Sequence, residues 1–247
     1  MTGTIINIAT ILIGSILGLF FGSRLPERVR ETVMAGLGVF TGAIGIQMFL
    51  KTENAIIVLG SILVGGILGE WLQIEAHLSQ VGSLLEKQFS KRTKGESRGD
   101  TSDEQTDSRA RFIQGFLTAS LLFCVGPMTI LGSIQDGLTG DYKLLAIKSV
   151  LDGFASLAFA STLGIGVIFS TLTVLFFQGG ISLLAVQAQA VITPAMMNEM
   201  TAAGGILLVG LAISSLLEIK PIRAGNFLPA LALAPLLVWI LSLLGLG

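Results

Sequence analysis

Two oppositely charged residues inside an otherwise apolar stretch are the strongest candidates for chemistry. Lys148 precedes Asp152 by four positions in AIKSVLDGFASLAF, a spacing that places both side chains on one face of a helix. A charge at membrane depth is costly, and it faces the interior of a bundle or a cavity. The pair therefore predicts a site where Asp152 binds Na⁺ or carries a proton, and where Lys148 sets its affinity. A structural ion pair that fixes helix register explains the same two residues.

A glycine–proline break in a second apolar stretch offers another kind of ligand. Pro127 follows Gly126, has no N–H group, and clashes with the carbonyl of Phe123 four residues earlier. Transporters use carbonyls freed at such breaks to coordinate cations. Gly126 and Pro127 are therefore predicted to belong to the ion site, and an ordinary proline kink is the alternative interpretation.

Three more polar residues are ion-binding candidates. Asn7 and Gln178 lie within apolar stretches, and their side-chain oxygens suit a cation, although hydrogen bonds between helices would use them equally well. Asp136 follows the glycine–proline stretch, where it would form part of an acidic mouth that attracts cations. Its place in an Asp-Gly pair is also typical of a turn.

The sequence predicts no enzyme, no cofactor and no metal centre. A single cysteine, Cys124, excludes a cysteine cluster, and a single histidine, His77, excludes a paired-histidine site. Zinc-protease, serine-hydrolase and nucleotide-binding motifs are absent. No residue is therefore assigned as catalytic, and a net charge of −1 gives no general affinity for nucleic acid.

The apolar stretches must position these residues, and their lengths predict membrane-spanning helices. The 247 residues are 52% hydrophobic and only 13% charged, about half the charged fraction of soluble domains. A bilayer core needs about 20 mostly apolar residues per helix. We therefore expect one all-α transmembrane domain over residues 1–247, a polytopic bundle of about eight spans. The expected spans are 4–23, 32–50, 55–74, 112–134, two spans from 144–186 that divide near Gly164 and Gly166, 199–219 and 227–246.

Charge distribution predicts the orientation of the bundle. Lysine and arginine favour cytoplasmic loops. If both termini are extracytoplasmic, the outside loops contain only Lys51 and Lys143, while the inside loops hold all the other basic residues apart from Lys148. The polar segment 86–111 is then a cytoplasmic loop, and its composition predicts disorder. Residues 78–89, which lead into this segment, have helical spacing and predict an amphipathic extension of the third span. This extension either lies on the membrane surface or projects into water.

Glycine spacing predicts close contact between helices. Gly14, Gly18 and Gly22 recur at every fourth position, and Gly65 and Gly69 repeat the interval. Without side chains, helices approach closely and gain van der Waals contact, which drives their association in lipid. Close packing is the main interpretation, and a pore lined by bare backbone is the alternative. The same faces leave a homo-oligomer open.

Several segments resemble the domain-of-unknown-function 554 family along essentially the whole chain. The most specific are FCVGPMTILGSIQDGLTGDY, KSVLDG, LGIGVIF and FFQGGISLLA between Phe123 and Ala185, with GTIINIA, GILGEWLQIE and IKPIRAGNFLPAL elsewhere. The resemblance implies a multi-pass protein of the prokaryotic plasma membrane, and a sodium channel or pump is the activity suggested for the family. It assigns no catalytic residue.

Together these observations predict a cation-linked transporter or channel for Na⁺ or H⁺ that has the lipid bilayer and a small cation or solute as its partners. The alternative is a membrane scaffold or sensor that transports nothing and acts through its cytoplasmic loop.

Overall fold

The chain is helical in almost all of the part that the structure describes. The computed structural model describes residues 1–22, 24, 26–93 and 102–244, and only the helical course of 89–93 and 102–108. These ranges contain no strand, so the predicted all-α class is confirmed. The helical segments in chain order are α1 (Thr2–Gly22), α2 (Glu27–Phe49), α3 (Ala55–Trp71), α4 (Ile74–Thr93), α5 (Ser102–Cys124), α6 (Pro127–Thr139), α7 (Lys143–Leu163), α8 (Gly166–Leu183), α9 (Ala185–Val191), α10 (Pro194–Leu211), the π-helical η1 (Ala212–Leu216), the 3₁₀-helical η2 (Ala224–Phe227) and α11 (Pro229–Leu243).

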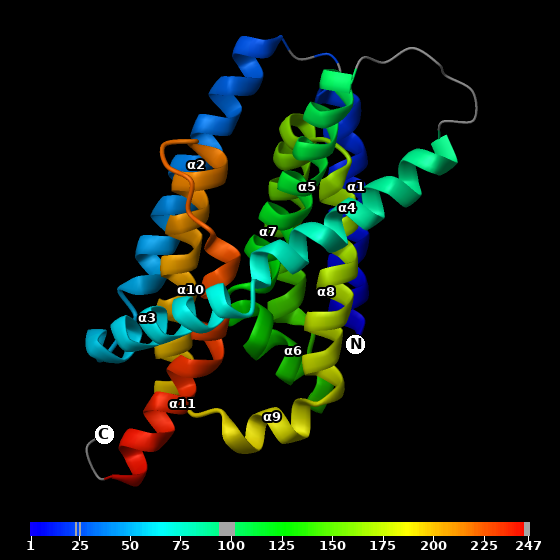
Figure 1. The fold of residues 1–247 in the computed structure, drawn as a ribbon. Helices are drawn as coiled ribbons and strands as arrows, with labels where there is room; N and C mark the ends of the chain where they lie inside the picture. The colour runs from blue at the N-terminus through cyan, green and yellow to red at the C-terminus, as the bar shows by residue number, and fades with distance from the viewer. Residues whose placement is uncertain (23, 25, 94–101, 245–247) are drawn as a thin grey trace.

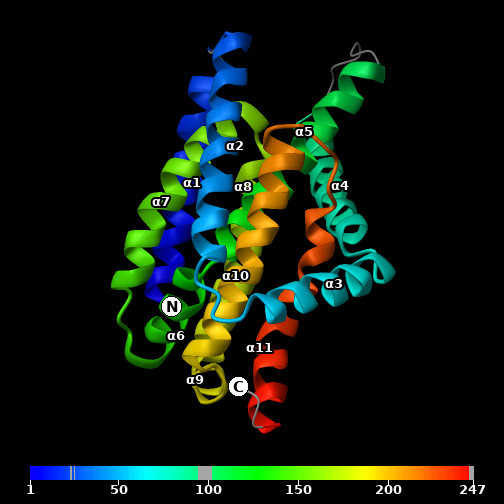
Figure 2. The same cartoon turned by 90° about the vertical axis from the view of Figure 1, so that its left-hand side faces the viewer.

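Six of these helical stretches are long and apolar enough to cross a membrane: α1, α2, α7, α8, α10 with η1, and η2 with α11. Two bent pairs, α3 with α4 and α5 with α6, are also apolar enough, with bends of 55° and 62°. If each pair is one crossing, the described residues contain up to eight spans, as the sequence predicts. Figures 1 and 2 show the long helices side by side, with α3 lying across them and both termini toward the same end. The side of the membrane that the termini face stays a prediction.

The long apolar region 144–186 divides where the sequence predicts. α7 ends at Leu163 and α8 begins at Gly166. Gly164 has a φ of 81°, a left-handed conformation that only glycine adopts readily. The glycine in this turn therefore lets the chain reverse and cross the bundle a second time.

The polar segment 86–111 differs from the predicted loop. Residues 86–93 continue α4 and residues 102–111 begin α5, and residues 94–101 lie outside the described part. The polar composition predicted disorder, but lysine, glutamate, glutamine and arginine are also good helix formers. Polarity along a segment therefore did not exclude a helix.

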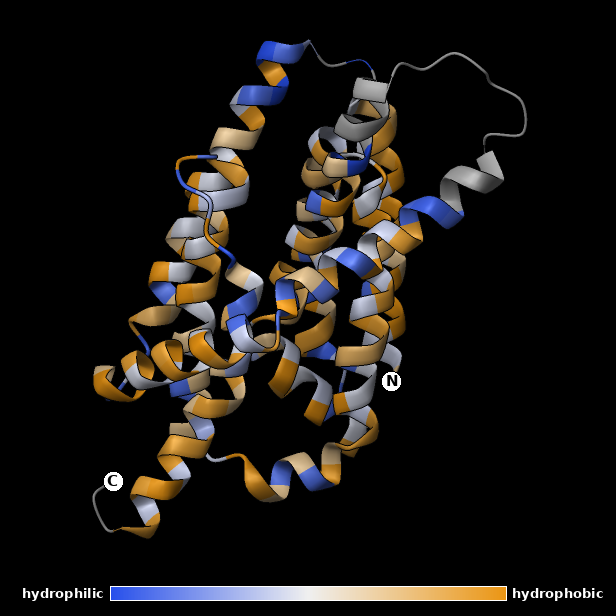
Figure 3. Cartoon of the chain, in the orientation of Figure 1, coloured by the Kyte–Doolittle hydropathy of each residue, from blue (hydrophilic) through white to orange (hydrophobic). Residues whose placement is uncertain are grey.

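Hydropathy follows the arrangement of the helices. Figure 3 shows hydrophobic residues along the long helices, while hydrophilic residues gather at the start of α2 and along α4. Many large apolar side chains are exposed on the outside of the bundle, among them Ile56, Ile67, Phe154 and Phe176. Such an exterior suits lipid as the solvent.

The most extensive helix contact in the described part of the chain joins α1 to α7, and glycines line it. A Cβ atom on Gly14 would lie 2.2 Å from the Gly153 carbonyl oxygen. A Cβ on Gly18 would lie 2.2 Å from the carbonyl oxygen of Leu157. Both distances are far below van der Waals contact, so the backbones of the two helices touch directly. The glycine repeat of α1 is thus a packing face, which confirms the main interpretation of the sequence.

We expect Gly14→Ala to destabilise the protein and Gly36→Ala to leave it unchanged or slightly stabilised. The first methyl group collides with α7, and overpacking of this kind costs about 1–3 kcal/mol. The second, on α2, meets no atom within 4 Å and improves helix propensity. Thermal unfolding of both purified variants in detergent checks this difference. Equal melting temperatures for the two variants contradict the packing role of Gly14.

Candidate functional site

Three spans bring predicted site residues into one hydrogen-bonded network. Asn7 of α1 donates through Nδ2 to Asp152 Oδ2 of α7 at 3.0 Å and to Gln178 Oε1 of α8 at 2.9 Å. Gln178 Nε2 donates in turn to the hydroxyl of Thr4 at 3.2 Å. Asn7, Asp152 and Gln178 therefore meet although the sequence separates them by up to 171 positions.

Lys148 completes the network by an ion pair with Asp152 Oδ2, one turn away on α7. Asn7 and Gln178 are completely buried, while Lys148 and Asp152 are 6% and 8% exposed. Charged groups in such surroundings need both a partner and hydrogen bonds. Asp152 Oδ2 accepts from Lys148 and from Asn7, so the carboxylate has both.

The helix face of α1 explains why Asn7 points at α7. Asn7 precedes Gly14 by seven positions, which is two helical turns, and so lies on the glycine face. Ser156 of α7 reaches across the same contact and donates to the carbonyl of Ile11 at 3.2 Å. Ser149 instead donates within α7, to Leu145 at 2.6 Å. The contact between α1 and α7 therefore fixes Asn7 beside Asp152.

One buried atom of the network has no hydrogen-bond partner in the described part of the chain, namely Asn7 Oδ1. An unsatisfied buried acceptor costs about 1–3 kcal/mol. Such an atom needs a donor or a cation, and it stands on the residue that joins Asp152 to Gln178. This is the atom of the network best suited to receive a ligand.

The break between α5 and α6 does not join the network. Pro127 begins α6 after Gly126, as predicted. The Phe123 carbonyl that the proline leaves free accepts the hydroxyl of Thr129 at 3.1 Å. Gly126 lines a separate cavity of about 500 Å³ whose walls are mainly apolar. No hydrogen bond among the described residues connects Gly126 or Pro127 to Asp152, so the predicted carbonyl shell has no support in the geometry.

Asp136 is buried and does not form an open acidic mouth. It is 3% exposed, and its Oδ2 accepts the N–H of Gly3 at 3.0 Å. Asp136 therefore ties α6 to the first turn of α1. Its Oδ1 is a second buried acceptor for which the described residues provide no partner.

Sequence reasoning missed a buried carboxylate on α10. Glu199 is 2% exposed and accepts the Thr52 hydroxyl at 2.6 Å, the Glu53 N–H at 2.8 Å and the Asn54 N–H at 3.0 Å. It holds the turn before α3 in place. Its position at the start of the apolar stretch 199–219 is the signal that the sequence carries for it.

A second polar cluster was also missed, where α3, α4 and η2 meet. Glu70 pairs with Arg223 and accepts from Asn226 Nδ2 at 2.7 Å. The Asp152 network is closed, whereas the cluster of Glu70, Arg223 and Asn226 is open to a pocket.

Among the described residues, no group of three or more His, Cys, Asp or Glu side chains is placed to hold a metal ion.

The helices and the buried ion pair define a multi-pass α-helical membrane protein. The chain belongs to the family described as protein of unknown function (DUF554), whose model matches residues 2–239. The resemblance predicted from the sequence is therefore confirmed.

Two curated relatives match the chain over nearly its whole length. It is 31% identical to the "Uncharacterized membrane protein YdfK" of Bacillus subtilis, over 100% of this chain and 99% of the relative. It is 32% identical to the "Uncharacterized protein YqgA" of Escherichia coli, over 94% of each chain. No solved structure matches.

We expect the Lys148–Asp152 pair to show strong thermodynamic coupling. Asp152→Asn leaves a buried ammonium without its partner, and Lys148→Met leaves a buried carboxylate, and breaking a buried pair costs about 3–5 kcal/mol. The double variant has neither charge, so it should be more stable than either single variant. Thermal unfolding of the four proteins measures the coupling. Losses that simply add up contradict a close buried pair.

Proposed function

We propose that the chain moves a small cation, Na⁺ or H⁺, across the prokaryotic plasma membrane, as a transporter or channel and not as an enzyme. The observation that carries the proposal is the buried Lys148–Asp152 pair, hydrogen-bonded to two other spans through Asn7. Intramembrane charges of this kind mark ion pathways and proton relays. The membrane location is supported by the apolar helices and by the printed name of the Bacillus relative.

The proposed step is a competition for the carboxylate of Asp152. An arriving proton or Na⁺ competes with the ammonium of Lys148 for Oδ2, so Lys148 sets how tightly the cation binds. When Lys148 withdraws, its place becomes available to the cation. Lys148 is therefore a positioning residue in this proposal, and Asp152 is the binding residue.

Neutral oxygens nearby suit a cation at the same place. Asn7 Oδ1 is buried and has no partner among the described residues, while Gln178 Oε1 accepts from the Asn7 amide and the Thr4 hydroxyl accepts from the Gln178 amide. Hard cations prefer carboxylate, carbonyl and hydroxyl oxygens. A rotation of the Asn7 amide would exchange its donor for an acceptor in front of Asp152. The network can thus hold either Lys148 or a cation with small side-chain movements.

We expect Asp152→Asn to abolish cation movement, because the variant keeps the shape of the site and removes the charge that exchanges the ion. Flux is measured in proteoliposomes of the purified wild type and variant under imposed Na⁺, K⁺ and pH gradients. Glu31→Gln is the matched control. Glu31 is exposed on α2, and the substitution removes one carboxylate charge outside the network.

The control should transport at the wild-type rate. Wild-type flux in a folded Asp152→Asn protein would sink the assignment of Asp152. Absence of flux in a folded wild type under all three gradients counts against cation movement itself.

A further inference from the structure

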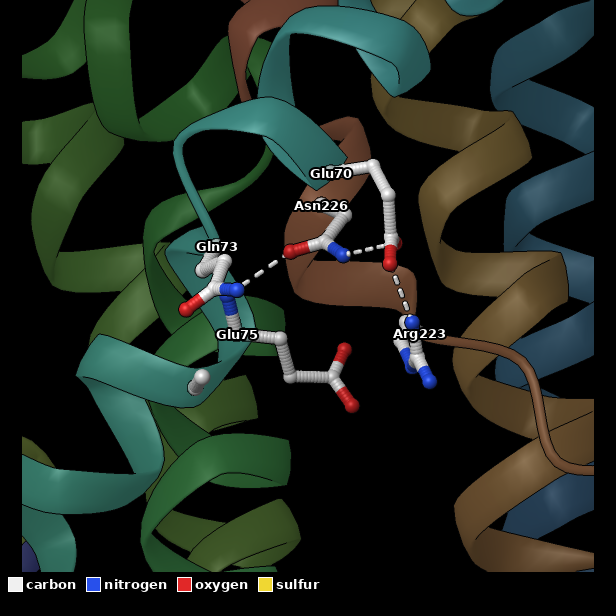
Figure 4. Close-up of a pocket in the computed structure, with 6 residues that line it drawn as sticks. Glu70, Gln73, Glu75, Arg223 and Asn226 are labelled. Carbon is white, nitrogen blue, oxygen red and sulfur yellow. Dashed lines mark hydrogen bonds and ion pairs between the residues drawn. The ribbon is translucent and has the colours of Figure 1, made fainter.

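A pocket of about 340 Å³ opens where α3 ends and α4 begins. Figures 1 and 2 show that the chain returns from the end of α10 part-way down the bundle before η2 and α11 begin, which brings η2 beside the α3–α4 junction. Glu70, Gln73, Glu75, Arg223 and Asn226 line the pocket, and Figure 4 shows Asn226 between Glu75 on one side and Glu70 with Arg223 on the other. None of these residues takes part in the Asp152 network.

Hydrogen bonds between segments far apart in the sequence build this pocket. Asn226 Oδ1 accepts the N–H of Glu75 at 2.8 Å, while its Nδ2 donates to Glu70 at 2.7 Å. The N–H of Gly225 donates to Glu75 Oε2 at 2.9 Å. One asparagine thus bridges the end of α3 and the start of α4. The walls of the pocket are held by at least three such bonds, so the space is part of the fold.

The charges that line the pocket do not balance. Glu70 and Glu75 bring two carboxylates, and Arg223 brings one guanidinium. Arg223 forms its ion pair with Glu70. Figure 4 shows the carboxylate of Glu75 extending from α4 toward Arg223, with no dashed line to the Arg223 side chain. Among the described residues, the Glu75 carboxylate therefore accepts the N–H of Gly225 but has no ion pair with a basic side chain.

The pocket is open at its rim, because the side chains of Glu70 and Arg223 are 57% and 68% exposed. It lies at the bend of one pair of helices apolar enough to span a membrane and at the first turn of the span Ala224–Leu243. A ligand with a single positive charge would complete the pairing, whereas an anion would add to the excess.

The size of the pocket distinguishes a small organic cation from a bare metal ion. A monatomic cation fills no more than the share of one water molecule, about 30 Å³. Small-molecule sites begin at about 300 Å³, and this pocket reaches that range. The Gln73 side chain and the Glu75 carboxylate offer oxygen acceptors for an ammonium group.

From charge and size together, we propose that the pocket between α3, α4 and η2 binds a small organic monocation that carries an ammonium group. The ammonium donates to Glu75 and Glu70, and the organic part fills the rest of the space. This binding goes beyond the proposed cation movement and does not depend on it, because it needs no gradient and no contribution from Asp152.

The probe is ethylammonium chloride, and the measurement is the thermal unfolding midpoint of the whole purified protein in detergent. A ligand that binds only the folded state raises the midpoint with concentration. A probe with three non-hydrogen atoms binds at best near the millimolar range, so it is titrated through that range. Sodium chloride at equal ionic strength controls for charge, and ethanol controls for size. Only ethylammonium should stabilise the wild type.

Variants of opposite charge give results of opposite sign. Glu75→Gln and Glu70→Gln each remove one negative charge and should weaken the apparent affinity by about tenfold. Arg223→Gln removes the positive charge and should tighten binding. Glu31→Gln, on α2, should bind as the wild type does. A purely structural role for the Arg223–Glu70 pair predicts lower stability without any change in the response to ethylammonium.

Several outcomes overturn the proposal. They are an unchanged response in folded Glu75→Gln, an equal stabilisation by sodium, and no stabilisation of the wild type. If Arg223→Gln does not fold, the two glutamate variants still decide the result. Asp152→Asn separates the two sites, because it should lose ion flux and keep ethylammonium binding. Loss of binding in that variant, with binding retained in Glu75→Gln, would move the ammonium to the Asp152 network.

Discussion

The close approach of α1 to α7 is the constraint on which the buried network depends. Gly14 and Gly18 let the main chains touch, and Asn7 lies on the same face two turns earlier. At this separation the short asparagine side chain reaches Asp152 at 3.0 Å and still contacts Gln178. Lipid supplies no hydrophobic drive between helices, so this contact is held by van der Waals packing and hydrogen bonds. Any side chain added to the glycine face therefore loosens the polar network as well as the packing.

The two bent helix pairs show that a helix break alone does not make a site. At the α5–α6 break, the carbonyl freed by Pro127 is satisfied locally by Thr129, and the neighbouring cavity is mainly apolar. At the α3–α4 break, the side chain of Asn226 accepts a hydrogen bond from the N–H of Glu75 in the first turn of α4, although the two residues are 151 positions apart. The same distant segment contains Arg223, which lines a charged pocket together with Glu70 and Glu75. The surroundings that satisfy the broken backbone therefore decide whether ions or apolar groups can enter.

The sequence predicted the features that depend on local chemistry. The division of 144–186 follows from the left-handed turn at Gly164, and the pairing of Lys148 with Asp152 follows from their spacing within one helix. Asn7 and Gln178 were identifiable as polar residues in apolar spans, but their contact was not, because tertiary packing joins residues 171 positions apart. Glu199 gave no local signal of the three donors that it meets across the bundle. The interpretation of Asp136 as part of an open acidic mouth assumed a place outside the span, whereas Asp136 lies buried within α6.

Charge balance gives the two polar sites different chemistry. The Asp152 network is closed and holds one positive and one negative charge, so a cation that enters it creates an excess unless Lys148 withdraws. Burying an unpaired charge is unfavourable, and the site therefore favours exchange over simple addition. The pocket at η2 holds two carboxylates and one guanidinium, and its Arg223 and Glu70 side chains are more than half exposed. A cation that enters this pocket neutralises it, so simple binding is favourable there. We therefore propose that one fold separates a place where a cation replaces a bound charge from a place where a cation balances an excess negative charge.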